Sequence, residues 1–352
     1  MYLKLLLLIT SFNYDVAGDP TGATDSTQAF KDAATYSRNA YKAYDTSTGR
    51  SGFSETIRIP PGKYKISDEI TNWSPVVNII GEDAVIIQTD TNKKTFNFTD
   101  GWQIKITGVQ FVGGANSVYL TNANVDYTTI TLRDCKFKDT SSYAVYMPNY
   151  LSCKAVIDNP MWVMCNAALY SNCDTTTIRD AYVQGFGGDN CFVNMHGVMH
   201  IDDSILVPTT SFPHQFWIKN YGHLFCTSVR FSGEASGGLP VLKHVGVLGK
   251  VYPYMGSKVV FQFCQLSAGS AKYAGAAVVT LDNGLPQLLK FDSCNYVVEI
   301  PLVYDTGSLA GILADSTVKK NMLSIVYEDC VSWPIMASGR VSDKLVPYFK
   351  VK

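Results

Sequence analysis

Large apolar residues recur along residues 104–296 in one six-residue pattern. The pattern is large apolar, any residue, small or polar, small, any residue, large apolar. Clear copies begin at Ile106, Leu132, Ile157, Ile178, Ile201 and Cys226, and looser ones at Phe261, Phe291 and Tyr327. Successive copies start 21 to 36 residues apart. A unit of this length cannot bury its own apolar face, so the copies are expected to stack on one another.

Each repeat also carries a second short run of strand-forming residues, bounded by Gly, Asn, Asp and Ser. These runs occupy residues 144–147, 168–171, 192–195, 217–220 and 241–244. Short strands and turns with no room for a helix predict an all-β parallel β-helix whose coils lie about 4.8 Å apart. The small fourth position of the pattern is then expected to form an inward ladder, which comprises Val109, Cys135, Pro160, Ala181, Ser204, Val229, Cys264 and Cys294.

The chain is expected to divide into three parts. Residues 1–75 form a capping strand, a helix and the start of the β-helix, residues 76–300 form its coils, and residues 301–352 form a last coil and a closing segment. Asp25 or Ser26 can cap a helix whose apolar face includes Phe30, Ala33 and Ala34. Laid over the open end of the stack, this helix would hide unpaired strand edges.

Composition excludes several classes of partner. Among 352 residues the net charge is −1, so no electrostatic argument favours nucleic acid or a membrane surface. Nine cysteines show no zinc-ligand spacing, and most are expected to be buried thiols. No metal or cofactor is predicted. Residues 1–10 are too short an apolar run to span a membrane; they can be a first strand or a signal peptide.

Residues 13–30 and 57–66 carry the most specific resemblance. They contain Gly18-Asp19, Gly22, Asp25-Ser26 and then Pro-Pro-Gly-Lys-Tyr at 60–64. This arrangement resembles the pectate-lyase-like superfamily, which includes polysaccharide lyases, polygalacturonase-type hydrolases and phage tailspikes. The resemblance implies a right-handed single-stranded parallel β-helix, a polysaccharide partner, an extracellular or virion location and, as in tailspikes, a homotrimer.

In hydrolases of this superfamily the binding groove follows the sheet formed by the second run of each coil. Strand alternation with Val145, Leu169, Val193, Ile218 and Leu242 inward gives two outward ladders. One is Tyr146, Tyr170, Asn194, Lys219 and Lys243; the other is Ala144, Ala168, Phe192, Trp217 and Val241. Aromatic rings pack on sugars and ammonium groups pair with carboxylates, so Tyr146, Tyr170, Asn194, Trp217, Lys219 and Lys243 suit an acidic polysaccharide. A solvated face or a subunit interface is the alternative.

A candidate acid lies in the turn before this sheet. Residues 187–194, Gly-Gly-Asp-Asn-Cys-Phe-Val-Asn, resemble the Gly-Asp-Asp-Cys-Ile segment of polygalacturonase-type hydrolases. Asp189 matches the first Asp, but Asn190 stands at the second. Glu234 is the nearest alternative partner for an acid–base pair. Alternatively, Asp189 only stabilises the turn through Asx hydrogen bonds.

Further candidates lie at other positions of the repeat. Asp158 and Asp202 are expected two coils apart, on the order of 10 Å, with Arg179 between them. They fit an inverting pair or, more simply, an ion ladder that holds the coils in register. His214 precedes a groove strand and can touch a ligand or have a structural role.

The chain is predicted to bind and cleave the polysaccharide as a tailspike-like depolymerase that uses carboxylate acid–base hydrolysis, and two alternatives stay open. A uronate lyase would use Lys219 or Lys243 with Tyr170 or His244 as the base. A hydrolase would use the carboxylates. A non-catalytic adhesin or virion fibre of the same fold would use neither.

Overall fold

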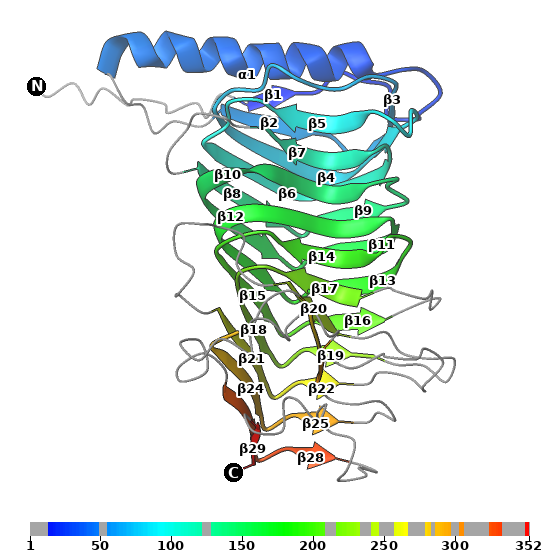
Figure 1. Cartoon of the computed structure of the whole chain (residues 1–352). Coiled ribbons are helices and arrows are strands. Elements are labelled where there is room, and N and C mark those ends of the chain that lie inside the picture. Colours follow the sequence, from blue (N-terminus) through cyan, green and yellow to red (C-terminus); the bar gives the residue numbers. More distant parts are fainter. Residues whose placement is uncertain are drawn as a thin grey trace, which may run out of the picture.

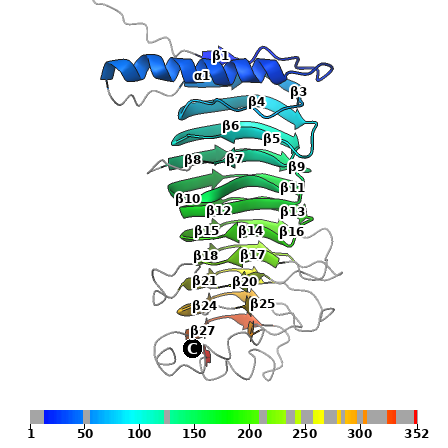
Figure 2. The same ribbon diagram turned by 45° about the horizontal axis from the view of Figure 1, so that its top comes forward.

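A computed structural model describes residues 13–48, 55–121, 128–207, 216–232, 241–245, 257–266, 279–282, 286–296, 303–305, 324–332 and 349–351. These residues form a right-handed parallel β-helix with one helix across its N-terminal end, as predicted (Figure 1). A second view of the same ribbon shows the coils stacked along a single axis (Figure 2).

The strands lie in three parallel sheets, which we name A, B and C in the order in which each coil visits them. Sheet A contains β1 (Asn13–Asp15), β2 (Glu55–Ile59), the first parts of β4 (Val76–Gln88) and β6 (Gln103–Gly113), β8 (Thr128–Arg133), the last parts of β10 (Tyr143–Asp158) and β12 (Ala167–Arg179), β15 (Val198–Asp202), β18 (His223–Thr227), β21 (Lys258–Gln262), β24 (Leu288–Asp292), β27 (Ser324–Glu328) and β29 (Phe349–Val351).

Sheet B contains β3 (Gly62–Ile66), the last parts of β4 and β6, β9 (Lys136–Lys138), β11 (Met161–Cys165), β13 (Tyr182–Phe186), β16 (Ile205–Val207), β19 (Arg230–Phe231), β22 (Gln265–Leu266), β25 (Asn295–Tyr296) and β28 (Val331–Ser332). Sheet C contains β5 (Lys94–Phe98), β7 (Asn116–Leu120), the first parts of β10 and β12, β14 (Asn190–Asn194), β17 (Phe216–Asn220), β20 (Leu242–His244), β23 (Val279–Leu281) and β26 (Val303–Asp305).

The six-residue repeat is the corner between sheets A and B. Its first residue is buried in sheet A and its last in sheet B, where Phe111, Phe137 and Trp162 stack at centroid distances of 5.6 and 5.7 Å. The small fourth position is buried, as predicted. The cysteines are free thiols, and eight of the nine are buried. Burial raises the pKa of Cys135 to about 12, so this thiol stays protonated.

The third position of every copy adopts a left-handed backbone conformation. Its φ lies between 47° and 70° at Gly108, Asp134, Asn159, Asp180, Asp203, Ser228, Phe263, Ser293 and Asp329. Gly, Asn and Asp tolerate this conformation best, which explains the small or polar preference at this position. Phe263 is the exception, and its side chain is 58% exposed.

Helix α1 (Thr27–Thr48) covers the end of the stack with Phe30, Ala33 and Ala34, which are all fully buried. The Asp25 carboxylate accepts a hydrogen bond from the Thr27 amide at 2.7 Å. Ion pairs then tie the helix to the coils. Lys31 and Lys93 both contact Asp68, and Arg38 forms two hydrogen bonds with Asp100.

Candidate functional site

The outer face of sheet C carries a compact cluster of tyrosines. Tyr119, Tyr146 and Tyr170 occupy one row in three successive coils, and Tyr143 lies beside them. Ring centroids are 5.3 Å apart for Tyr119 and Tyr146, 4.8 Å for Tyr146 and Tyr170, and 5.4 Å for Tyr143 and Tyr146. All four rings are partly exposed. We call these four residues the tyrosine track.

Three phenol groups of the track, those of Tyr119, Tyr143 and Tyr170, have raised pKa values. Burial raises the pKa of Tyr143 to about 12, with smaller contributions from Tyr170, Tyr146 and the charge of Asp189. Burial is also the main cause that raises the pKa of Tyr119 and of Tyr170. A phenol group can donate one hydrogen bond and accept others, while its ring offers an apolar face.

The strands of sheet C that the structure describes carry three lysines. Lys94 lies 4.0 Å above the ring of Tyr119 and 3.8 Å from the Glu69 carboxylate. Lys243 forms an ion pair with Asp282 at 3.0 Å. Lys219 lies 5.4 Å from the centroid of Tyr221, which continues the aromatic surface toward the C-terminal coils.

Asp189 lies at the edge of the track, as part of the turn that leads into β14. Its side chain is exposed, and its main-chain oxygen accepts a hydrogen bond from the Phe216 amide at 2.9 Å. Its charge acts on the Tyr143 phenol. Within the described part of the chain, its carboxylate forms neither an ion pair nor a side-chain hydrogen bond.

The predicted outward position of Asn194 is wrong. Asn194 is only 1% exposed, and its amide donates hydrogen bonds to Asn220 Oδ1 and the main-chain oxygen of His223. Leu169 pairs with Phe192, and Tyr170 with Val193. The turn before β14 is one residue shorter than the prediction assumed, and a slip of one residue exchanges the two faces of a strand.

The second predicted outward ladder is wrong as well, because Ala144, Ala168, Phe192, Trp217 and Val241 are all buried. Trp217 lies at the corner between sheets B and C, and its ring contacts Phe186 with centroids 5.1 Å apart. Trp217 therefore cannot reach a sugar on the outer face. The row of Tyr146, Tyr170, Lys219 and Lys243 has the predicted alignment, with Val193 in the place given to Asn194.

Asp158 and Asp202 lie on sheet A, away from the tyrosine track, in the row that runs from Arg133 through Arg179. Asp158 accepts a hydrogen bond from Arg133 Nε at 3.0 Å. This contact supports the predicted ion ladder between coils. Glu234 and His214 lie outside the described residues, so their proposed roles stay predictions.

Sequence reasoning missed Tyr119 and Tyr143, although a signal for Tyr119 was present. Residues 116–120, Asn-Ser-Val-Tyr-Leu, repeat the alternation of residues 143–147 one coil earlier. Tyr143 had no such signal, because its approach to Tyr146 and Tyr170 depends on the path of the chain as it enters β10.

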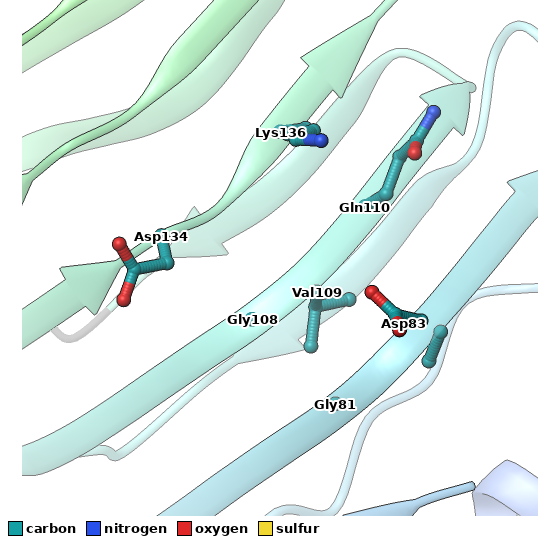
Figure 3. Close-up of a pocket in the computed structure, with 8 residues that line it drawn as sticks. Gly81, Asp83, Gly108, Val109, Gln110, Asp134 and Lys136 are labelled. Carbon is teal, nitrogen blue, oxygen red and sulfur yellow. The ribbon is translucent and has the colours of Figure 1, made fainter. Parts of the chain in front are cut away.

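A second surface feature is a depression of about 320 Å³ at the corner of sheets A and B. Figure 3 shows Asp83, Asp134, Gln110 and Lys136 around it. Asp83 and Asp134 both occupy left-handed turn positions, and Asp134 accepts a hydrogen bond from Asn159. The depression is therefore explained by the turns themselves.

The described residues contain no cluster of three or more His, Cys, Asp or Glu side chains placed to hold a metal ion. In the same residues, no helix is both long and apolar enough to cross a bilayer.

Neither a protein-family model nor a curated protein matches the sequence. Among solved structures, the chain is similar to two viral proteins and one bacterial surface protein. The tailspike protein of E. coli bacteriophage HK620 is 14% identical, with a TM-score of 0.48 over 95% of this chain and 67% of that one. ORF18 of Geobacillus virus E2 is 11% identical, with a TM-score of 0.38 over 94% of this chain and 58% of that one. This chain therefore spans less than two thirds of the length of ORF18. PfbA, a surface adhesin of Streptococcus pneumoniae, is 11% identical, with a TM-score of 0.38 over 91% of this chain and 88% of that one.

Proposed function

We propose that the outer face of sheet C binds an extended polysaccharide that lies along the tyrosine track. The observation that carries this proposal is the convergence of four partly exposed rings, contributed by β7, β10 and β12, within 4.8–5.4 Å of their neighbours. Aromatic faces bury the apolar faces of sugar rings, and phenol groups exchange hydrogen bonds with sugar hydroxyls. A row that follows the stacking axis suits a ligand that is itself a chain.

Alanine substitution of Tyr146 and of Tyr170 tests the proposal by isothermal titration calorimetry with a panel of neutral and acidic polysaccharides. Each substitution is expected to weaken binding about 2- to 13-fold, because one aromatic contact contributes roughly 0.5–1.5 kcal/mol. Phe225→Ala is the matched control, since Phe225 is a partly exposed aromatic residue on the outer face of sheet A, stacked on His200. Equal effects of all three substitutions, or no binding to any glycan by the unaltered protein, would refute the proposal.

We further propose that the bound chain is cleaved, with Asp189 as one member of a carboxylate pair. Its exposed side chain beside Tyr143 supports this role, because a catalytic acid or base must reach the substrate. Glu234 remains the proposed partner. Asp189→Asn is expected to abolish new reducing ends and to leave glycan affinity within about 2-fold of the original. Unchanged cleavage by this variant would exclude Asp189 from the chemistry.

The lyase alternative receives less support. Lys243 is engaged by Asp282, and His244 is fully buried, so neither is available to take a proton from a uronate. Of the groups predicted for a lyase, only Lys219 and Tyr170, both partly exposed, remain for this step. A lyase product would absorb ultraviolet light through its conjugated enol acid, whereas a hydrolase yields only reducing ends. If a glycan binds but yields neither ultraviolet absorbance nor new reducing ends, a non-catalytic adhesin or fibre is favoured.

We also propose that the protein acts outside the cell or on a virion as a homotrimer. The outer face of sheet B supports an assembly, because Met164, Tyr182 and Ile205 expose 51%, 36% and 42% of their surface. Exposed apolar side chains on one face, of which Tyr182 and Ile205 are paired in adjacent strands, often mark contact surfaces. Light scattering should give three times the chain mass of 38.7 kDa, and Ile205→Glu should lower it.

A further inference from the structure

The charges on sheet C differ from those that a uniformly acidic polysaccharide needs. Two of the three lysines already have a carboxylate partner, Glu69 for Lys94 and Asp282 for Lys243. A uronate that approached either lysine would have to displace that partner or lie beside its negative charge. Two of the three candidate cation positions are therefore electrically satisfied before any ligand arrives.

Lys219 is different. It contacts the ring of Tyr221 and forms no ion pair with any residue that the structure describes. Its side chain is half-buried in the row that continues the tyrosine track. An ammonium group in this position can accept a ligand carboxylate, sulfate or phosphate without losing a partner of its own.

At the tyrosine track, Asp189 disfavours an anionic ligand. Its carboxylate is exposed, and its charge is felt at Tyr143. Like charges repel, so an anionic sugar over Tyr143 is disfavoured, whereas a neutral sugar there keeps the full aromatic contact. The face therefore has a neutral aromatic region and one cationic position.

The spacing between these regions follows from the coil register. Tyr170 pairs with Val193, and Val193 pairs with Lys219, so Lys219 lies two coils from Tyr170, about 10 Å along the axis. Val193 is 2% exposed and presents no charge between them. A ligand that satisfies both regions has uncharged sugars on the tyrosines and one acidic group about 10 Å beyond Tyr170.

We propose that the natural ligand is a sparsely charged heteropolysaccharide, with one acidic group per repeating unit held by Lys219, rather than a polyuronate. This inference rests on the proposed function and narrows its ligand class. It also narrows the sequence-based expectation that Lys219 and Lys243 both suit an acidic polysaccharide.

Binding is compared for four probes: gellan, in which one sugar of each repeat is a uronate, carboxyl-reduced gellan, polygalacturonate and dextran. The unaltered protein is expected to bind gellan about 5-fold more tightly than its carboxyl-reduced form, because a partly exposed ion pair contributes up to about 1 kcal/mol. Lys219→Gln should remove this difference. Lys136→Gln, on the exposed surface of sheet B, is the matched control and should preserve it.

A gain of binding provides the reciprocal test. Asp282→Asn removes the partner of Lys243 and should raise the affinity for polygalacturonate about 5-fold, with little effect on the gellan preference. Tighter binding of polygalacturonate than gellan by the unaltered protein, or a preference for gellan over its reduced form that survives Lys219→Gln, would overturn the inference while leaving the tyrosine track intact. Failure of the proposed function is recognised separately, by Tyr146→Ala and Tyr170→Ala variants that bind every probe as the unaltered protein does.

Discussion

Acidification below pH 6.5 should destabilise the coils around His244, because burial and the hydrogen bonds of its ring both favour the neutral form. His244 is fully buried. Asn220 Oδ1 accepts hydrogen bonds from the Gly222 amide and from Asn194 Nδ2, so Asn220 Nδ2 must face His244 Nδ1, 3.1 Å away. Nδ1 is therefore an acceptor, and Nε2 carries the hydrogen that faces Ser257 Oγ at 3.0 Å.

A proton added to Nδ1 would oppose the Asn220 donor and place a charge in the core. Burial, with a smaller contribution from the charge of His223, lowers the pKa of His244 to about 3, from 6.5. Between these values the unfolded chain binds a proton that the folded chain does not. The stabilisation is complete above pH 6.5 and is lost as the pH falls toward 3. At about pH 4.5 the loss is about 3 kcal/mol, since each pKa unit corresponds to about 1.4 kcal/mol.

The assay is urea unfolding at pH 7.5 and pH 4.5, for the unaltered protein and for His244→Gln, followed by far-ultraviolet circular dichroism. The variant cannot titrate at this position, so the difference between the two pH dependences isolates His244. We expect the unaltered protein to lose about 3 kcal/mol more than the variant. Equal losses, or a His244 ring that titrates above pH 5 by NMR, would refute the reasoning.

Two further predictions concern stability. Phe263 has a φ of 53° and a 58% exposed side chain. The Phe263→Asn variant should be more stable than Phe263→Ala by about 1 kcal/mol in thermal unfolding, because both lack the ring and Asn tolerates the left-handed conformation better. Equal stabilities of the two variants would contradict this. Arg38→Ala should lower the stability of the capped end by about 1.5–3 kcal/mol through loss of the paired hydrogen bonds to Asp100, and hydrogen exchange in α1 should increase; Lys65→Ala, an exposed control in β3, should leave exchange unchanged.

The fold was predictable because its constraints are local and repeat in every coil. The apolar first and last positions, the small buried fourth position and the left-handed third position can each be recognised in the residue types of most copies of the pattern. The helix over the open end was predictable for a similar reason, since Phe30, Ala33 and Ala34 share one face. Errors began where coil length varies, because one residue fewer before β14 reversed the faces assigned to Asn194 and its neighbours.

The sequence by itself determined that this chain is a parallel β-helix, because a repeated apolar pattern can be buried only by stacking its copies. It also determined that Tyr146, Tyr170, Lys219 and Lys243 share a row. Only the tertiary structure decided which charges on that row are already paired, since Lys243 and Asp282 lie 39 residues apart in the chain. The approach of Tyr119 and Tyr143 to the track was decided in the same way. Contacts between side chains of different coils depend on loop lengths and register, which no single repeat encodes.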